Sequence, residues 1–185
     1  MLGEKALPSK PGVYILVIRV TNDICVVTKA KTFNIRRGLY AYVGSALSGL
    51  RRRLTRYLRK PTRKHWHIDY LLEKASLLLV LYSLTENREV RPELELSREL
   101  EVSPLFEPVP GFGCSDLREV RSNLYRYKYE DYNSLLETLR EVMTRLFGNV
   151  HEVNLMESTV DKPRTLKLQQ GGGDEFPTND RAKSG

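Results

Sequence analysis

The spacing of hydrophobic residues along the chain predicts a mixture of strands and helices. Residues 12–20 (GVYILVIRV) are apolar at consecutive positions, which is typical of a strand buried on both faces. Residues 24–28 follow directly after the turn-prone sequence TND, so the two segments predict a β-hairpin. Further strands are predicted at residues 38–44, 77–84 and 123–129.

Helices are predicted where polar segments carry apolar residues at helical spacing. Residues 49–60 are helical until Pro61 ends the helix, and a second helix lies near residues 67–75. A third helix opens at Pro92, and residues 131–147 form an amphipathic helix that Gly148 stops. The predicted order is β-β-β-α-α-β-α-β-α, which indicates the α/β (α+β) class.

The length of 185 residues suits one ordinary domain with a buried core. Residues 1–160 are predicted to form this domain, with the helix at residues 131–147 near its C-terminal end. Residues 161–185 are polar, rich in glycine and without hydrophobic periodicity. They therefore predict a flexible tail.

The positive charge is concentrated in the first half of the chain. The net charge is +7, but residues 1–92 carry 18 Lys or Arg against 6 Asp or Glu, and residues 93–185 carry 12 against 17. Residues 51–64 contain eight basic residues and no acidic one. Such a segment favours a polyanionic partner such as a nucleic acid. The alternative is a charged helix face that only meets water.

The sequence carries no pattern typical of a membrane-spanning, disulfide-rich or zinc-knuckle protein. No apolar stretch approaches the length of a membrane span, and the N-terminus has no signal-peptide pattern. Cys25 and Cys114 belong to no CxxC pair, so neither a disulfide framework nor a zinc knuckle is indicated. We therefore expect a cytoplasmic protein that has no membrane partner.

The arginine-rich helix has two faces on a helical wheel of about 100° per residue. Its apolar stripe consists of Leu50, Leu54, Tyr57 and Leu58. Its opposite face, expected to lie in water, consists of Arg52, Arg56 and Arg59. Arg53 falls at the edge of the apolar stripe, one turn before Tyr57. It is either oriented toward a phosphate group or stretched over apolar surface with its charge in water.

Glu93 is the second charged residue in an unexpected place. If Pro92 is the first residue of its helix, Glu93 shares the inward face with Leu96 and Leu100. A carboxylate there needs a cation, a hydrogen-bonding helix terminus or a raised pKa. The alternative is a first-turn glutamate that the helix dipole stabilises.

Two short glycine-tyrosine motifs precede these residues along the chain. Gly12-Val13-Tyr14 begins the first strand, Tyr42-Val43-Gly44 ends a later strand, and an arginine lies on the next helix. This order resembles the GIY-YIG nuclease pattern. HWHIDYLLEKA (residues 65–75) and PGFGCSD (residues 110–116) extend the resemblance to a stand-alone, poorly characterised branch of that superfamily. The resemblance covers roughly residues 8–128.

The resemblance implies a metal-dependent phosphodiesterase on a small, mainly antiparallel central sheet flanked by helices. Its catalytic residues would be Tyr14, Tyr42, Arg53 and Tyr57. Glu93 would hold a single Mg²⁺ or Mn²⁺ ion, and Arg53 would stabilise the charge on the phosphorus group in the transition state. The general base stays open, because a phenol with a pKa near ~10 must be shifted by nearby cations or act through orientation.

The sequence departs from the family pattern at three places. Ser45 follows YVG, where the incision nucleases of excision repair have a lysine, so one positive contact to the substrate is missing or comes from elsewhere. Tyr57 stands where this branch tends to have histidine. Leu117, Arg118 and Glu119 replace its usual Cys-rich segment, which removes any metal-cluster interpretation.

The remaining basic and histidine residues are predicted to contact nucleic acid. His65 and His67 could grip zinc only in extended geometry, because residues two apart face opposite sides of a helix. We expect them instead to pack beside the basic helix and to touch a sugar or base. The predicted nucleic-acid-binding residues are Arg51, Arg52, Arg56, Arg59, Lys60, Arg63, Lys64, His65 and His67.

The sequence therefore predicts a single-domain endonuclease that acts on DNA rather than RNA, in branched or damaged structures. No separate sequence-reading module such as a zinc finger is visible. The alternative is a nucleic-acid-binding module that kept this fold and lost or weakened catalysis.

Overall fold

The computed structural model describes residues 7–59, 63–85, 91–114 and 119–155. Lys60, Leu117, Arg118 and the predicted tail at residues 161–185 lie outside these ranges. Among the described residues, no helix is both long enough and apolar enough to cross a membrane.

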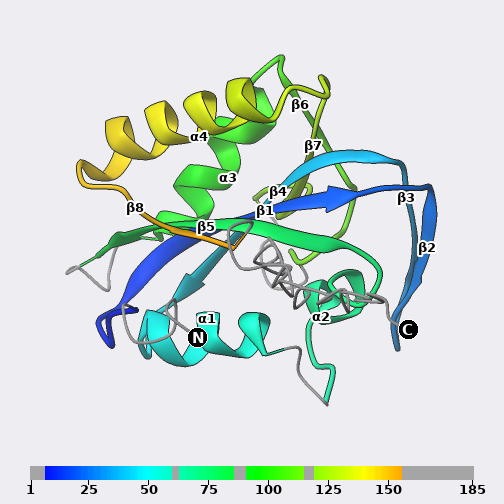
Figure 1. The fold of residues 1–185 in the computed structure, drawn as a ribbon, viewed down its shortest axis with the longest axis horizontal. Helices are drawn as coiled ribbons and strands as arrows, with labels where there is room; N and C mark the ends of the chain where they lie inside the picture. The colour runs from blue at the N-terminus through cyan, green and yellow to red at the C-terminus, as the bar shows by residue number, and fades with distance from the viewer. Residues whose placement is uncertain (1–6, 60–62, 86–90, 115–118, 156–185) are drawn as a thin grey trace, which may run out of the picture.

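A six-stranded antiparallel sheet runs through the centre of the molecule in the order β6-β7-β4-β1-β5-β8 (Figure 1). Its two central strands, β1 (Gly12–Val20) and β4 (Gly38–Ala46), pair along their whole length. The four flanking strands are β5 (Ser76–Leu84), β6 (Phe106–Pro108), β7 (Leu124–Tyr127) and β8 (His151–Asn154). The class predicted from the sequence, an antiparallel sheet flanked by helices, is confirmed.

Two pairs of helices cover the two faces of this sheet (Figure 1). On one face lie α1 (Leu50–Leu58) and α2 (His67–Leu71), and on the other lie α3 (Pro92–Val102) and α4 (Tyr132–Phe147). The side chains of β1 alternate between these two layers because successive residues of a strand point to opposite faces. Every residue of β1 except Arg19 is buried, as the continuous apolar sequence predicts.

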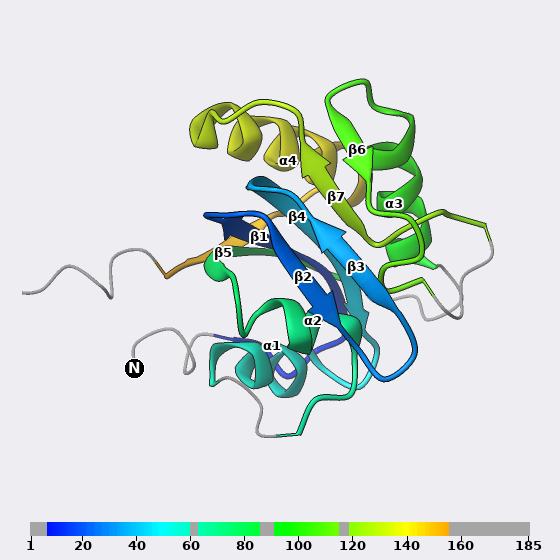
Figure 2. The same cartoon turned by 90° about the vertical axis from the view of Figure 1, so that its right-hand side faces the viewer.

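The predicted hairpin between the first two strands is wrong. β2 (Ile24–Val27) pairs with β3 (Thr32–Ile35) in a separate two-stranded sheet, which we call the β2–β3 arm. The arm extends from the central sheet past α2 (Figure 2). Phe33 fixes it, because its ring packs against His67 at 5.0 Å and against Phe112 at 4.9 Å between ring centroids.

The helices begin at or within one residue of the predicted starts, and two of them end earlier than predicted. α1 ends at Leu58 rather than at residue 60. Pro92 is the first residue of α3, and Asp131 caps α4 by accepting hydrogen bonds from the backbone N–H groups of Asn133 and Ser134. α2 is shorter than the predicted helix and ends at Leu71. The short strands β3, β6 and β8 were not predicted.

Candidate active site

The two glycine-tyrosine motifs lie side by side because β1 and β4 are paired. Tyr14 of β1 lies directly opposite Gly44 of β4, and Leu16 lies opposite Tyr42. A Cβ atom on Gly44 would collide with the Tyr14 phenol, so only glycine leaves room for this ring. Tyr14 and Tyr42 both point to the face that α1 covers. The register of two strands therefore brings both motif tyrosines to one place.

Tyr57 of α1 completes a buried pair with Tyr14. The two hydroxyl oxygens are 3.0 Å apart and hydrogen-bonded, and the ring centroids are 6.0 Å apart. Leu50 and Leu54 seat α1 on the sheet, as the apolar stripe predicts. Tyr57 is 3% exposed, so its hydroxyl meets Tyr14 rather than bulk water.

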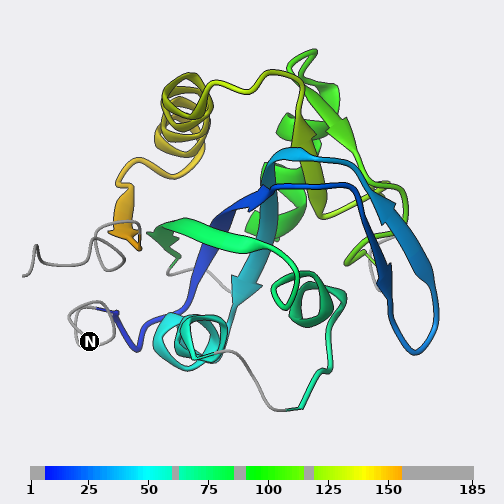
Figure 3. The ribbon, with the colours of Figure 1, turned by 45° about the vertical axis from the view of Figure 1, so that its right-hand side comes forward.

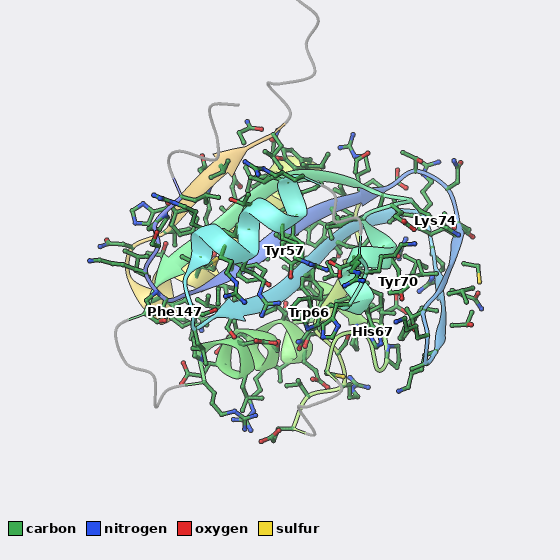
Figure 4. All side chains as sticks on the ribbon, turned by 90° about the horizontal axis from the view of Figure 1, so that it is seen from below. Tyr57, Trp66, His67, Tyr70, Lys74 and Phe147 are labelled. Atoms are coloured by element: carbon green, nitrogen blue, oxygen red, sulfur yellow. The ribbon has the colours of Figure 1, made fainter. Side chains whose placement is uncertain are left out.

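Arg53 lies at the flank of α1, half-buried, as the helical wheel predicts. Its guanidinium carbon is 4.0 Å from the centroid of the Trp66 ring. Burial alone would lower the pKa of Arg53, but the neighbouring Tyr14 and Tyr57 phenols raise it, so the guanidinium stays charged. Figure 4 views this face and labels Tyr57 and Trp66 close together.

The three tyrosines keep their protons near neutral pH. Burial raises the pKa of Tyr14 well above its ordinary value, and Tyr57 adds to the rise while Arg53 opposes it. Burial also raises the pKa of Tyr57, against the hydrogen bond from Tyr14 and the charge of Arg53. The pKa of Tyr42 is raised for the same leading reason. These phenols can therefore donate and orient hydrogen bonds, but they are poor general bases.

Glu93 lies in the first turn of α3, on the face of the sheet opposite to α1, and its carboxylate is held by two neutral donors. Its Oε2 accepts a hydrogen bond from Ser45 Oγ at 2.7 Å, and its Oε1 accepts one from Asn123 Nδ2 at 2.6 Å. α3 packs on the face away from α1, but β7 pairs with β4 only at Tyr40–Tyr42. Beyond these pairs Val43 N–H still donates to the Asn123 carbonyl at 2.8 Å, and Glu93 lies beside Ser45 and Asn123 at this end of β4.

Arg53 and Glu93 both act on the Tyr42 phenol. After burial and the Tyr57 phenol, the Glu93 carboxylate is the next cause of the raised pKa of Tyr42, whereas Arg53 lowers it. A cation from α1 and an anion from α3 thus lie within electrostatic range of one phenol. The structure brings together four chain segments that the sequence singled out separately.

A glycine loop connects the Glu93 side of the site to the HWHID segment. Asn123 Nδ2 also donates to the Gly113 carbonyl at 3.1 Å, and Gly113 N–H donates to His67 Nδ1 at 3.0 Å. Gly113 has φ of 77°, and a Cβ there would come within 3.1 Å of both Tyr42 and Asn123. Burial and the charge of Lys31 lower the pKa of His67, so its ring is neutral and its Nδ1 can accept. His67 thus orders the loop that holds Asn123.

Arg56 does not lie free in water, which corrects the helical-wheel prediction. Its Nη2 forms an ion pair of 2.6 Å with Asp69 Oδ2, and the Asp69 side chain has no exposed surface. The same carboxylate oxygen accepts the backbone N–H groups of His65 and Trp66. The wheel failed because it contains no information about α2. Asp69 therefore fixes the backbone that presents Trp66 to Arg53.

The other predicted nucleic-acid-binding residues differ in exposure, and several of the exposed ones also contact other parts of the protein. Arg51 donates from Nε to the Leu7 carbonyl, and Lys64 pairs with Glu73 at 2.7 Å. His65 packs edge-on against Trp66. The exposed members of the set are Arg51, Arg52, Arg59, Arg63 and His65.

Glu93 is the candidate metal ligand that the family resemblance implies. No group of three or more His, Cys, Asp or Glu side chains lies in ligating arrangement within the described ranges, so nothing supports a zinc site at His65 and His67. Glu93 has neutral donors on both oxygens and no basic ion-pair partner among the same residues. One such carboxylate with water in the remaining positions is a common way to bind Mg²⁺.

Sequence reasoning missed several residues that arrange this site. Ser45 seemed only to lack a positive charge, whereas its hydroxyl holds Glu93. Asn123 was assigned to a strand, although it precedes β7 and its buried side chain bonds to three partners, Glu93, Gly113 and Ser97. The one available signal for Asn123 was an amide residue directly before an aromatic strand, which is too common to indicate a role.

Comparison with known proteins identifies the family but gives it no activity. Residues 13–147 match the family described as "Domain of unknown function DUF123". No curated protein and no solved structure matches the chain. The match spans all of the tyrosine, arginine and glutamate residues described above, and more than half of the chain. The protein therefore belongs to this family of unknown function.

Proposed function

We propose that the protein is a metal-dependent endonuclease of the GIY-YIG type that hydrolyses phosphodiester bonds in DNA. The family match is consistent with this superfamily but does not name it. The observation that carries the proposal is the hydrogen-bonded Tyr14–Tyr57 pair one turn from Arg53 on α1, with Glu93 held by Ser45 directly after the Tyr42-Val43-Gly44 motif. A guanidinium, a carboxylate and neutral phenols are a suitable set for phosphoryl transfer to water.

Arg53 would bind the non-bridging oxygens of the phosphodiester. A guanidinium offers planar donors that match a phosphate group, and its charge stabilises the negative charge that develops in the transition state. The stacking on Trp66 limits the directions in which Arg53 can point. The cation is therefore oriented before the substrate arrives, which lowers the reorganisation needed for reaction.

The tyrosines would orient the reacting groups as neutral donors. Their raised pKa values argue against a phenolate that removes a proton from water. The Tyr14–Tyr57 hydrogen bond holds both hydroxyls next to Arg53. This arrangement favours the orientation role that the sequence left open for them.

Glu93 would hold Mg²⁺ or Mn²⁺, with Ser45 and Asn123 fixing the direction of its carboxylate. A divalent ion bound there would supply Lewis acidity toward the phosphate and leaving oxygens. The hydroxyl and amide donors carry no positive charge, so they do not compensate the carboxylate as an arginine ion pair would.

Cleavage assays with matched variants test the proposal. Branched, nicked and single-stranded DNA are incubated with Mn²⁺ and the wild type, Glu93→Gln or Arg53→Ala, with Glu95→Gln and Arg98→Ala as exposed controls on α3. We expect each site variant to cut at least ~100-fold more slowly and both controls to cut normally. Equal cutting by all five proteins would indicate contamination and remove the support for a nuclease. Binding without cutting by the wild type would favour the alternative of a catalytically inactive binding module.

A further inference from the structure

A basic pocket lies between the β2–β3 arm and the segment that precedes α2. Its volume is about 710 Å³, and it is lined by Lys29, Arg56, Arg63, Lys64, His65 and Tyr70. Lys29 comes from the turn of the arm, Arg56 from α1, and the other four from residues 63–70. The arm and α2 lie side by side (Figure 3), and they contact each other directly. Three separate parts of the chain thus contribute cations to one hollow.

The positive charge of this pocket is only partly neutralised. Among the residues that the structure describes, no acidic side chain lines it. Arg56 and Lys64 are engaged in ion pairs with Asp69 and Glu73. Lys29 and Arg63 are exposed, and neither has an acidic partner within the described ranges. A concave surface with uncompensated cations attracts anions, so these two side chains are the ones available to a ligand.

Arg56 connects the basic pocket to the candidate active site. It also lines a smaller pocket of about 270 Å³ together with Ser48, Arg52, Arg53 and Trp66. Arg53 is the residue proposed to bind the reacting phosphate. The two pockets therefore share one wall, and cationic side chains continue from the reaction centre to the tip of the arm.

We propose that the basic pocket is a subsite for a second phosphodiester of the substrate strand, on one side of the reacting phosphate. This inference rests on the proposed function. Phosphates recur at regular intervals along a nucleic acid, so a row of cations leading away from Arg53 fits a continuing strand. The pocket is in the size range that holds a small ligand, which leaves room for a sugar beside the phosphate. An acidic peptide would match the charge but not the connection to Arg53.

Binding measurements with charge-matched variants test the subsite. The parent protein carries Glu93→Gln to block cleavage, and binding to a short fluorescein-labelled DNA is followed by anisotropy as salt is varied. The test variant adds Lys29→Ala and Arg63→Ala, and the control adds Arg98→Ala and Lys128→Ala, which remove the same charge elsewhere. Compared with the control, we expect the test variant to bind DNA ~10-fold more weakly. The slope of log K against log salt should be smaller in magnitude by about 1 in the test variant. Identical behaviour of test and control variants would overturn the inference.

Neutral phosphates locate the contact on the strand. Each phosphate of the DNA is replaced in turn by an uncharged methylphosphonate. We expect one position, distinct from the scissile phosphate, to weaken binding by the parent but not by the test variant. If the test variant keeps the same sensitivity at every position, the subsite does not exist.

Two further outcomes distinguish this inference from the proposed function. If the parent binds no DNA even at low salt, the nuclease proposal itself loses its premise. If it binds DNA without help from Lys29 and Arg63 but needs both to bind polyglutamate, the pocket takes an acidic peptide and the phosphodiester subsite is overturned. Thermal melting of the test and control variants is compared beforehand, and these four exposed side chains are expected to leave it unchanged.

Discussion

The guanidinium carbon of Arg53 lies 4.0 Å from the centroid of the Trp66 ring, and this contact joins α1 to the segment before α2. Asp69 fixes the same segment through its backbone N–H groups. The direction of the candidate catalytic arginine therefore depends on a motif that lies outside the glycine-tyrosine pattern. Trp66 is a positioning residue in this account, since it acts through Arg53.

Replacing Trp66 should slow cleavage without weakening substrate binding in proportion. Trp66→Leu removes the ring, and we expect kcat to fall ~10-fold with a smaller change in KM, because a cation–π contact of about 1 kcal/mol orients Arg53. Trp66→Tyr keeps an aromatic face and should recover most of the rate. Steady-state kinetics of both variants measure these changes. Equal losses of kcat in Trp66→Leu and Trp66→Tyr would contradict the prediction.

Removing either hydroxyl of the Tyr14–Tyr57 hydrogen bond should destabilise the fold, and removing both should cost little more than removing one. Tyr14→Phe and Tyr57→Phe should each lower the free energy of unfolding by about 1 kcal/mol, and the double variant should lose less than the sum, because one bond is removed in all three. Urea unfolding measures these values. Tyr132→Phe is the control, because its buried hydroxyl has no hydrogen-bond partner within the described residues and its removal should cost nothing. If the double variant loses as much free energy of unfolding as the two single variants together, the two hydroxyls do not act through one bond.

The buried ion pair between Arg56 and Asp69 should matter more than an exposed pair nearby. Asp69→Asn leaves Arg56 without its counter-charge, and we expect a loss of about 2–3 kcal/mol, allowing for the partial exposure of Arg56. Glu73→Gln removes the partner of Lys64 at the surface and should cost about 0.5 kcal/mol or less. Chemical unfolding of the two variants compares them directly, and equal losses would contradict the prediction.

Acid should destabilise the protein partly through His67. The folded state lowers the pKa of His67, so the unfolded chain takes up a proton first as the pH falls below about 6.5. The contribution of His67 is therefore present above that pH and is lost as the pH falls through the lowered pKa. His67→Gln keeps an acceptor for Gly113 N–H and should show a weaker drop in unfolding midpoint between neutral and mildly acidic pH. If the unfolding midpoint falls equally with pH in His67→Gln and in the wild type, His67 does not contribute to the acid sensitivity.

Ser45 and Asn123 should tune the affinity of Glu93 for metal. Their hydrogen bonds fix both oxygens of the carboxylate, and partners of this kind change metal affinity by roughly 10- to 100-fold when removed. We expect Ser45→Ala and Asn123→Ala each to weaken Mn²⁺ binding by about 10-fold, measured by the spin resonance of free Mn²⁺. Ser48→Ala is the control, because Ser48 lines a pocket on the α1 side. Unchanged affinity in both variants would show that Glu93 needs no such support.

The central strands and most helices could be predicted because their signals are local. The continuous apolar sequence of β1, Pro92 at the start of α3 and Asp131 before α4 each specify an element within a few residues. Strand pairing is not local, and β2 pairs with β3 rather than β1. β6 has only three residues and ends in proline, so it carries no periodicity that could predict it.

The tyrosines were found through a family resemblance, and Arg53 and Glu93 were first singled out by their places on helical wheels, but the contacts of these residues were not predicted. No spacing in the sequence places Ser45 or Asn123 against Glu93, because these contacts cross from β4 and the start of β7 to α3. The same holds for Arg56, whose partner Asp69 lies on another helix. Sequence patterns select candidate residues for the chemistry, and only tertiary packing shows which other residues orient them.

A crystal structure of the protein with Mn²⁺ and a short DNA duplex that carries uncleavable phosphorothioates would test the central claim most directly. The account predicts an anomalous manganese peak within about 2.0–2.3 Å of a Glu93 oxygen, and a phosphate that contacts both this ion and the Arg53 guanidinium. Manganese bound elsewhere, or a duplex lying across the α3–α4 face with no phosphate near Arg53, would contradict it.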